Sequence, residues 1–364
     1  MDERAAMTRA VALALRGWGR VAPNPMVGAV LLKDGRVIGE GFHAEHGGPH
    51  AELAALSAAA DPAGATCVVT LEPCAHHGKT PPCAEALVAK GVRRVVIAGR
   101  DPDPVSGDGV ARLREAGVAI ELGLGAEAAA AANAAFLWST VRPARPFVAV
   151  KVATSLDGFI ADRAGRSRWI SGGEAREFVH WLRAGFDGIA VGRRTAVRDD
   201  PQLTVRGPIA PRVPPARIVF AGRGPLAPSL ACLDPDAPGR ALVVRAAGTA
   251  GPRRAEPGEL AASGVTVLET AGLPEALAAL RREGVRALLV EGGGRLVGAL
   301  LDAGLVDRVY QITAPLWLGD GTPAFGQRAG IGLAEAPRWS VTERRALGQD
   351  SLVVVDRELC LLAS

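Results

Sequence analysis

The chain has 364 residues, of which 48% are hydrophobic and 22% charged, and its formal net charge is +4, from 42 Lys and Arg against 38 Asp and Glu. This composition predicts a soluble globular protein of two domains and excludes disordered and collagen-like chains. The sequence has no apolar run of about 18 residues, no signal-peptide pattern and no dense basic block, so we expect a cytoplasmic protein that binds neither membrane nor nucleic acid. Five cysteines, an odd number, favour metal binding or burial over a disulfide framework.

The first part of the chain alternates helices and strands. Helical spacing covers 4–16, strand patterns at 27–32 and 37–41 flank a turn at Asp34-Gly35, and a second helix is predicted over 51–60. A strand over 66–71, a helix over 82–90, a strand over 94–99 and a helix ending near Trp138 follow. This alternation predicts an α/β domain. Pro143 and Pro146 then indicate a linker, so we place the domains at 1–145 and 147–364.

The second part starts with a strand over 147–153. Ser171 and Glu174 form a capping-box pattern ahead of a predicted helix, and Gly185 is its expected stop. Strands are expected near 188–191, 217–220, 241–244, 287–290 and 308–313, with Pro/Gly-rich loops at 207–215 and 247–258. The chain has no internal repeat, so the two halves should be different α/β folds.

Histidines and cysteines crowd one stretch of the first half. Five of the six histidines lie there, and Pro49-His50-Ala51-Glu52 precedes Cys74 and Cys83. One His and two thiolates offer zinc three ligands and leave a fourth position for water, which is a catalytic arrangement. Positions i and i+2 of a helix diverge, so His50 is the predicted ligand and Glu52 the predicted general base that transfers protons from the zinc-bound water to the leaving amine.

The spacing of the two cysteines narrows the class of deaminase. Nucleic-acid and cytidine deaminases have two residues between them, whereas eight separate Cys74 from Cys83 here. Pro-His-Ala-Glu followed by Thr-Leu-Glu-Pro-Cys-Ala-His-His-Gly-Lys-Thr-Pro-Pro-Cys resembles the deaminase domain of the bifunctional riboflavin-biosynthesis deaminase/reductases. The resemblance implies a cytidine-deaminase-like three-layer α/β/α domain. It also implies that Asn24 and His43 contact a pyrimidine, and that His76 and Lys79 reach the substrate, including its ribose phosphate.

Two further motifs lie in the second half. Lys151 begins a strand that ends in the tight turn Asp157-Gly158, and Glu291 opens a glycine loop ahead of a predicted helix over 295–303. Glycines let backbone N–H groups approach a pyrophosphate at a helix N-terminus. The loop is not Gly-x-Gly-x-x-Gly and no acidic ribose partner follows it, so a standard Rossmann domain is disfavoured.

These motifs recur, in this order, in the reductase domain of the same family, which resembles dihydrofolate reductase in fold. Lys151 would polarise or orient the sugar carbonyl or imine, and Arg183 with Arg206 would suit a phosphate clamp. Where the family commonly has Asp-Ser, this chain has Ala221-Gly222, so the strictness of its preference for NADPH is open. The resemblance assigns substrate binding to Ser167, Arg183, Leu203, Arg206 and Glu291, and NADPH binding to Ala153, Trp169, Thr195, Asp199, Gly293, Gly294, Arg295, Leu296, Val297, Gly298 and Ala299.

The sequence therefore predicts a two-domain enzyme with one zinc and NADPH. It would deaminate a phosphoribosylated diaminopyrimidine and then reduce the ribosyl group to ribityl, and we expect a homo-oligomer. A nucleic-acid deaminase, such as a tRNA adenosine deaminase, with an unrelated appended domain is the main alternative; the wide cysteine spacing and the lack of a basic, aromatic surface disfavour it. A non-catalytic protein with a structural zinc is the other, and Glu52, which no structural site requires, argues against it.

Overall fold

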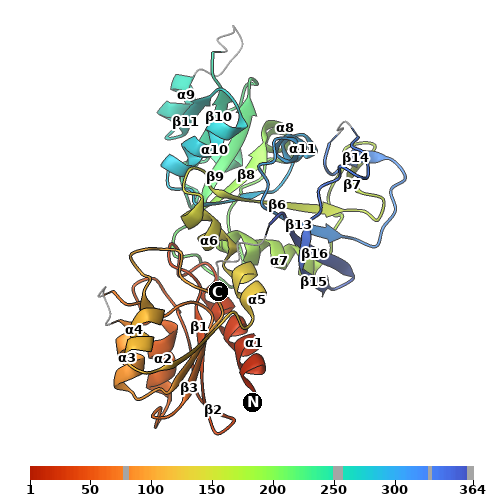
Figure 1. Ribbon diagram of the computed structural model, residues 1–364. Helices are drawn as coiled ribbons and strands as arrows, with labels where there is room; N and C mark the ends of the chain where they lie inside the picture. Colours follow the sequence, from red (N-terminus) through yellow and green to blue (C-terminus); the bar gives the residue numbers. More distant parts are fainter. Residues whose placement is uncertain (77–81, 249–256, 327–329, 359–364) are drawn as a thin grey trace. The chain divides into compact units, whose positions relative to one another are not determined.

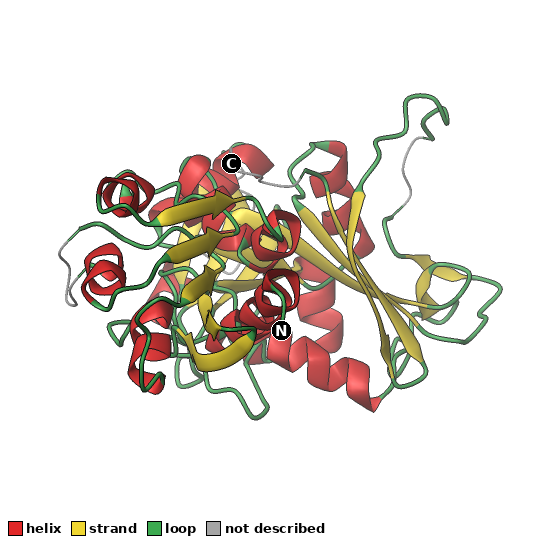
Figure 2. Cartoon of the chain, turned by 60° about the horizontal axis from the view of Figure 1, so that its bottom comes forward, coloured by secondary structure: helices red, strands yellow, loops and turns green. Residues whose placement is uncertain are grey.

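The computed structural model describes residues 1–76, 82–248, 257–326 and 330–358, and it divides into one compact unit ending at Val141 and a second covering Arg142–Glu358 (Figure 1). Each unit is built around a mixed β-sheet, and red helices flank the yellow strands in Figure 2. The predicted α/β class is confirmed for both units. Among the described residues, no helix has the length and apolar character needed to cross a membrane.

The sheet of the first unit has the strand order β2-β1-β3-β4-β5. β1 is antiparallel to β2 and β3, whereas β3, β4 and β5 run parallel. The predicted hairpin is confirmed, and its turn places Asp34 and Gly35 at φ values of 51° and 71°. The strands are β1 (Gly28–Lys33), β2 (Arg36–Phe42), β3 (Thr66–Val69), β4 (Arg94–Ile97) and β5 (Ala119–Leu122).

Helices cover both faces of this sheet. Side chains alternate between the faces of a strand, so Leu31 packs with α2, α3 and α4 while Val30 packs with α1 and α5. Both cores are buried, and the three-layer α/β/α arrangement predicted for this part of the chain is present. The helices are α1 (Glu3–Ala14), the 3-10 turn η1 (Leu15–Gly17), α2 (Ala51–Ala58), α3 (Cys83–Ala89), α4 (Gly109–Glu115), α5 (Ala126–Ala132) and α6 (Ala134–Val141).

The second unit has a nine-stranded sheet of order β11-β10-β9-β8-β12-β6-β13-β16-β15. The strands from β11 to β13 are parallel to their neighbours, and β16 and β15 add an antiparallel edge. A separate ribbon pairs β7 with β14. The strands are β6 (Phe147–Thr154), β7 (Phe159–Asp162), β8 (Gly188–Gly192), β9 (Ala216–Gly222), β10 (Ala241–Ala246), β11 (Thr266–Thr270), β12 (Ala287–Val290), β13 (Arg308–Thr313), β14 (Gly321–Pro323), β15 (Ser340–Leu347) and β16 (Asp350–Asp356).

Helices also pack on both faces of the large sheet. Leu277 of α10 and Leu300 of α11 belong to the core on one face, and Ala196 of α8 and Leu260 of α9 belong to the core on the other. The helical elements are α7 (Gly173–Ala184), α8 (Arg193–Asp199), the 3-10 turn η2 (Ala231–Leu233), α9 (Pro257–Ala262), α10 (Leu273–Arg282) and α11 (Gly294–Asp302).

One predicted detail of α7 is wrong. The N-cap is Gly172 rather than Ser171, and no side chain caps this end, so Ser171 and Glu174 do not form a capping box. At this end of the helix the backbone N–H of Gly172 instead donates to the carboxylate of Asp350 in β16, with 2.7 Å between the nitrogen and Oδ2. The helix ends at Gly185 as predicted.

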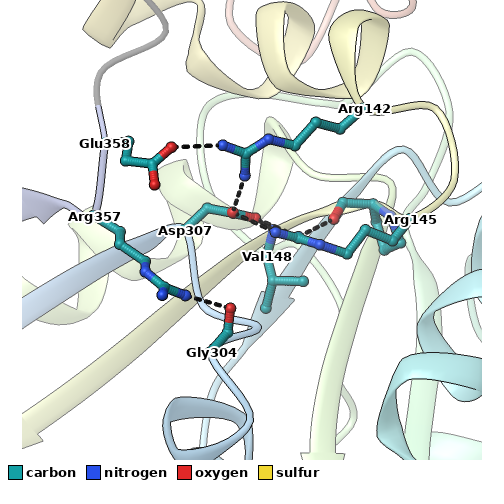
Figure 3. Close-up of polar contacts among 8 residues, drawn as sticks. Arg142, Arg145, Val148, Gly304, Asp307, Arg357 and Glu358 are labelled. Carbon is teal, nitrogen blue, oxygen red and sulfur yellow. Dashed lines mark hydrogen bonds and ion pairs between the residues drawn. The ribbon is translucent and has the colours of Figure 1, made fainter.

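The segment that follows α6 is held to the second unit by Asp307, whose side chain is buried (Figure 3). The Asp307 carboxylate accepts hydrogen bonds from Arg142 and Arg145 and from the backbone N–H of Val148. Arg142 also donates to Glu358 at 2.8 Å. The predicted linker therefore contributes side chains to the second unit.

Candidate active sites

The first site lies where two helices begin. His50 is the N-cap of α2, Cys83 is the first residue of α3, and Cys74 lies in the loop that follows β3. His50 Nδ1 is 3.5 Å from Cys74 Sγ and 3.3 Å from Cys83 Sγ, and the three ligand atoms lie within 4.8 Å of one another. The donor set fits zinc, which takes imidazole and thiolate ligands and, with three from the protein, keeps one position for water.

Glu52 lies in the first turn of α2, beside this group. Its side chain is buried, and burial raises the pKa of the carboxyl to about 7, although a hydrogen bond with the Cys83 side chain partly opposes the shift. The carboxyl is therefore next to the zinc ligands without being one of the three clustered donors.

Two further polar side chains, Asn24 and His43, lie on the His50 side of the cluster. Asn24 Nδ2 is 3.2 Å from His43 Nε2, and His43 Nδ1 is 3.0 Å from the carbonyl oxygen of Pro49. With Nδ1 protonated, His43 donates to Pro49 and accepts from Asn24, which leaves the amide oxygen of Asn24 for a ligand. The His43 ring lies edge-on to His50, with ring centroids 5.4 Å apart.

His76 has a buried Nδ1 with no hydrogen-bond partner among the described residues. An orphaned buried nitrogen favours a bound group that the structure does not contain. Lys79 and His77 lie outside the described residues, as does Cys360. Cys67 and Cys232 are fully buried, which agrees with the structural role expected for them.

The second site is a cavity of about 1300 Å³ at the carboxyl ends of the parallel strands in the second unit. Open α/β sheets bind ligands at this edge. Leu203 is absent from the lining: it is buried in the core beneath α8 with φ 55°. The cavity is lined by Lys151, Ala153, Ser167, Trp169, Arg183, Thr195, Asp199, Arg206, Glu291, Gly293, Gly294, Arg295, Leu296, Val297, Gly298 and Ala299.

Three charged residues meet at one end of the cavity. Arg183 donates from Nε and Nη2 to the two oxygens of Glu291, and Lys151 Nζ is 3.6 Å from Glu291 Oε2. Burial alone would raise the pKa of Glu291, but the positive charges of Arg183 and Lys151 outweigh it and hold that pKa at about 2. The carboxylate is thus ionised and orients both cations. Arg183 also donates from Nη1 to the Thr204 carbonyl at 2.8 Å.

His180 is a residue of this site that the sequence interpretation missed. It lines the cavity from α7, and its Nδ1 accepts the Arg206 N–H at 3.2 Å. Burial, with Arg183 and Arg206 nearby, lowers the pKa of His180 to about 4, so the ring is neutral at pH 7. The sequence could have indicated His180, because it lies three residues before Arg183 and residues three apart share a face of a helix.

The glycine loop lies between β12 and α11. Gly293 has a φ of 80° and is the N-cap of α11, and a Cβ on Gly294 would lie 2.5 Å from the Pro323 carbonyl oxygen. Only glycine fits both positions. The open end of α11 and the loop amides suit a pyrophosphate, so the lining fits the diphosphate of a dinucleotide.

Family models match both parts of the chain. Residues 1–99 match the cytidine and deoxycytidylate deaminase zinc-binding region, and residues 146–353 match the RibD C-terminal domain. The second match argues against the alternative of a nucleic-acid deaminase with an unrelated appended domain.

Whole-length relatives are similar to the chain throughout. It is 38% identical to riboflavin biosynthesis protein RibD of Escherichia coli (strain K12), over 96% of this chain and 98% of that protein. It is 35% identical to RibD of Aquifex aeolicus, over 96% and 97%.

Solved structures agree. The deaminase/reductase of Thermotoga maritima is 35% identical with a TM-score of 0.81, covering 97% of this chain and 98% of that one. RibD of Acinetobacter baumannii is 37% identical with a TM-score of 0.79 and the same coverage. The predicted combination of a deaminase-type domain with a reductase domain is therefore confirmed.

Proposed function

Because the chain belongs to the RibD family of riboflavin biosynthesis proteins, with zinc and NADPH as its cofactors, we propose that it catalyses two consecutive steps of that pathway. The first is hydrolytic deamination of 2,5-diamino-6-(5-phosphoribosylamino)pyrimidin-4-one. The second is reduction of the ribosyl group of the deaminated product, which yields 5-amino-6-(5-phosphoribitylamino)uracil. The single observation that carries the proposal is the His50, Cys74 and Cys83 cluster beside a buried Glu52, in a chain whose second unit has the family's reductase fold.

In the deaminase site, zinc bound by the three ligands supplies a Lewis acid that makes water nucleophilic near neutral pH. Glu52 accepts a proton from the attacking water and delivers it to the departing amino group. Burial suits this role, since a pKa close to 7 lets the carboxyl both accept and release a proton. Asn24 and His43 orient the pyrimidine, and His76 with Lys79 contacts the rest of the substrate.

In the reductase site, bound NADPH supplies the hydride. Lys151 lies beside the ionised Glu291 and orients or protonates the sugar atom that gains negative charge. Arg183 contributes to substrate binding and holds Glu291, whereas Arg206 contacts the substrate phosphate. Ser167 completes the proposed side-chain contacts with the substrate, and Leu203, whose side chain lies in the core, would contribute through its backbone alone. The 293–299 segment holds the diphosphate of the cofactor.

The order of the reactions can be tested on the zinc-loaded protein. With the phosphorylated diaminopyrimidine and no NADPH, ammonia release should equal substrate consumed and the ribosyl group should stay intact. Adding NADPH should then start oxidation of the cofactor, with one equivalent consumed per ammonia released. NADPH oxidation without prior ammonia release would contradict the proposed order, and no ammonia release at all would contradict the deaminase assignment.

We also propose that the two activities are separable. A fragment covering 1–145 should deaminate without NADPH, and a fragment covering 147–364 should reduce without zinc. Because Arg142 and Arg145 both pair with Asp307, a reductase fragment that begins at Arg142 should be more stable than one that begins at 147. An inactive reductase fragment of either length, with the full chain active, would contradict separability. The homo-oligomeric state and the cytoplasmic location remain predictions.

A further inference from the structure

The reductase cavity extends along the carboxyl ends of neighbouring parallel strands, so the strand order gives the order of the residues that line it. Lys151 of β6 and Glu291 after β12 lie at the reacting end, and the glycine loop before α11 comes next. The far end is lined by residues at the carboxyl ends of β9, β10 and β11. A dinucleotide with its reactive ring near Lys151 and its diphosphate at the glycine loop therefore places its adenosine half over β9 and β10.

A buried cation lies at that far end. Arg245 is the second-to-last residue of β10 and pairs with Gly222 of β9. It lines the cavity, and only 3% of its surface is exposed. Strand alternation places its side chain on the same face as Val243, which packs in the core beneath α8 with Ala221.

A second arginine reaches the same place from α8. Arg193 lies in the first turn of α8 and lines the cavity. Its side chain extends to the loop after β9, since a Cβ built on Gly224 would lie 2.1 Å from Arg193 Nε. Ala221 and Gly222 of β9 also line the cavity and offer no side-chain donor. Among the described residues of β9, β10 and β11, none that lines the cavity is acidic.

We propose that Arg193 and Arg245 bind the 2′-phosphate of the adenosine ribose and so select NADPH over NADH. The inference rests on the proposed reductase function and adds the residues that discriminate between the cofactors. Guanidinium groups match phosphate oxygens in geometry and charge. Sites that select the unphosphorylated cofactor hold the ribose hydroxyls with a carboxylate, and no such carboxylate is found among the described residues of β9, β10 and β11 that line this end of the cavity.

The test measures binding of NADP⁺ and NAD⁺ to the full-length protein by calorimetry, without turnover. The unchanged protein should prefer NADP⁺. Arg193→Ala and Arg245→Ala should each weaken NADP⁺ binding about ten-fold or more, while NAD⁺ binding changes less than about three-fold. Arg240→Ala is the control. Arg240 directly precedes the amino end of β10, away from the cavity, and pairs with Glu283. Its removal should therefore alter neither affinity.

A substitution in open space gives an independent test that does not depend on removing a buried arginine. Gly222 is exposed with a φ of 57°, and an added Cβ would meet nothing within 4 Å. Asp tolerates this backbone region better than most residues. Gly222→Asp should repel the phosphate and shift preference toward NAD⁺. Gly284→Asp is the matched control, because Gly284 has a φ of 84° with the same open space, at the amino end of β12.

The possible outcomes distinguish a failure of the proposed reductase function from a failure of the role proposed for the two arginines. If the unchanged protein binds neither dinucleotide, the proposed reductase function fails. If it prefers NADP⁺ and the variants keep that preference, the function stands and the role of the two arginines is wrong. Should Arg245→Ala fail to fold, Arg193→Ala and Gly222→Asp decide: lost preference in both supports the inference, and retained preference in either overturns it.

Discussion

Arg145 and Asp307 form a two-pronged ion pair, in which each terminal nitrogen of the guanidinium donates to one carboxylate oxygen at 2.7 Å. The Asp307 side chain is 4% exposed and that of Arg145 is 21% exposed. The same carboxylate accepts the Val148 N–H at the start of β6 (Figure 3). The pair therefore fixes the point at which the chain enters the reductase sheet, close to Lys151.

Arg145→Ala should lower the stability of the reductase unit by about 2–3 kcal/mol, because it leaves a buried carboxylate with fewer donors. Thermal unfolding of the full-length protein, followed by loss of reductase activity, measures the effect. Arg9→Ala is the control: it breaks an ion pair with Glu40 at the surface, where solvent screens the charges, so it should destabilise the protein far less. Equal destabilisation by the two variants would show that Asp307 does not depend on Arg145.

Glu52→Gln should keep one zinc per chain yet lower the deamination rate at least about 100-fold, since the amide retains the shape of the side chain but cannot accept the proton. Metal analysis and ammonia release measure the two properties separately. NADPH-dependent reduction of the deaminated substrate should be unchanged. Loss of zinc together with activity would make Glu52 a ligand.

Cys83→Ser should remove most of the zinc, because a neutral hydroxyl replaces a thiolate poorly on this metal. Cys67→Ala is the matched control, since Cys67 is equally buried in the same unit but lies outside the ligand cluster. Zinc content after dialysis distinguishes them. Full retention of zinc in Cys83→Ser would refute the assignment of that cysteine.

The pH dependence of reduction should change when Arg183 is removed. The pKa of Glu291 is lowered from 4.5 to about 2, so its ionised form is favoured by folding, and that stabilisation is present above 4.5 and lost only as the pH falls toward 2. The unchanged protein should therefore show no loss of kcat/KM from Glu291 between about pH 5 and 8. In Arg183→Met it is mainly the charge of Lys151 that still opposes the effect of burial, so the pKa of Glu291 should rise. The value of kcat/KM should then fall at the acidic end of this pH range. An unaltered pH profile would mean that Lys151 alone keeps Glu291 ionised.

Arg206→Ala should raise the KM for the phosphorylated substrate about ten-fold or more and leave the KM for NADPH nearly unchanged. Steady-state kinetics with each substrate varied in turn provides the measurement. The lowered pKa of Glu291 is due mainly to the positive charges of Arg183 and Lys151, so this variant should also keep the pH profile. A larger effect on NADPH would move Arg206 to the cofactor side of the cavity.

The zinc cluster could be predicted from the sequence because its parts are local. His50 and Cys83 lie at helix starts that follow directly from the chain pattern, and the buried strand β3 leads into the loop that carries Cys74. The same reason made it possible to predict the hairpin at Asp34-Gly35 and those strands that are continuous apolar runs. The strands that the sequence analysis did not predict are β5, β7, β11, β14, β15 and β16. For β11 and β15 the reason is that exposed residues interrupt their apolar patterns.

The sequence by itself determined which residue types could do zinc and dinucleotide chemistry and which short segments carry them. Only the tertiary structure decided which distant charges meet: Glu291 with Arg183 from α7, and Asp307 with Arg145. It also decided that Arg193 and Arg245 line the same cavity. The cavity residues come together where adjacent parallel strands, connected through helices, end, whereas Arg145 and Asp307 come together where the neighbouring strands β6 and β13 begin. Strand order is set by packing between layers of the fold, and no local pattern in the chain encodes it.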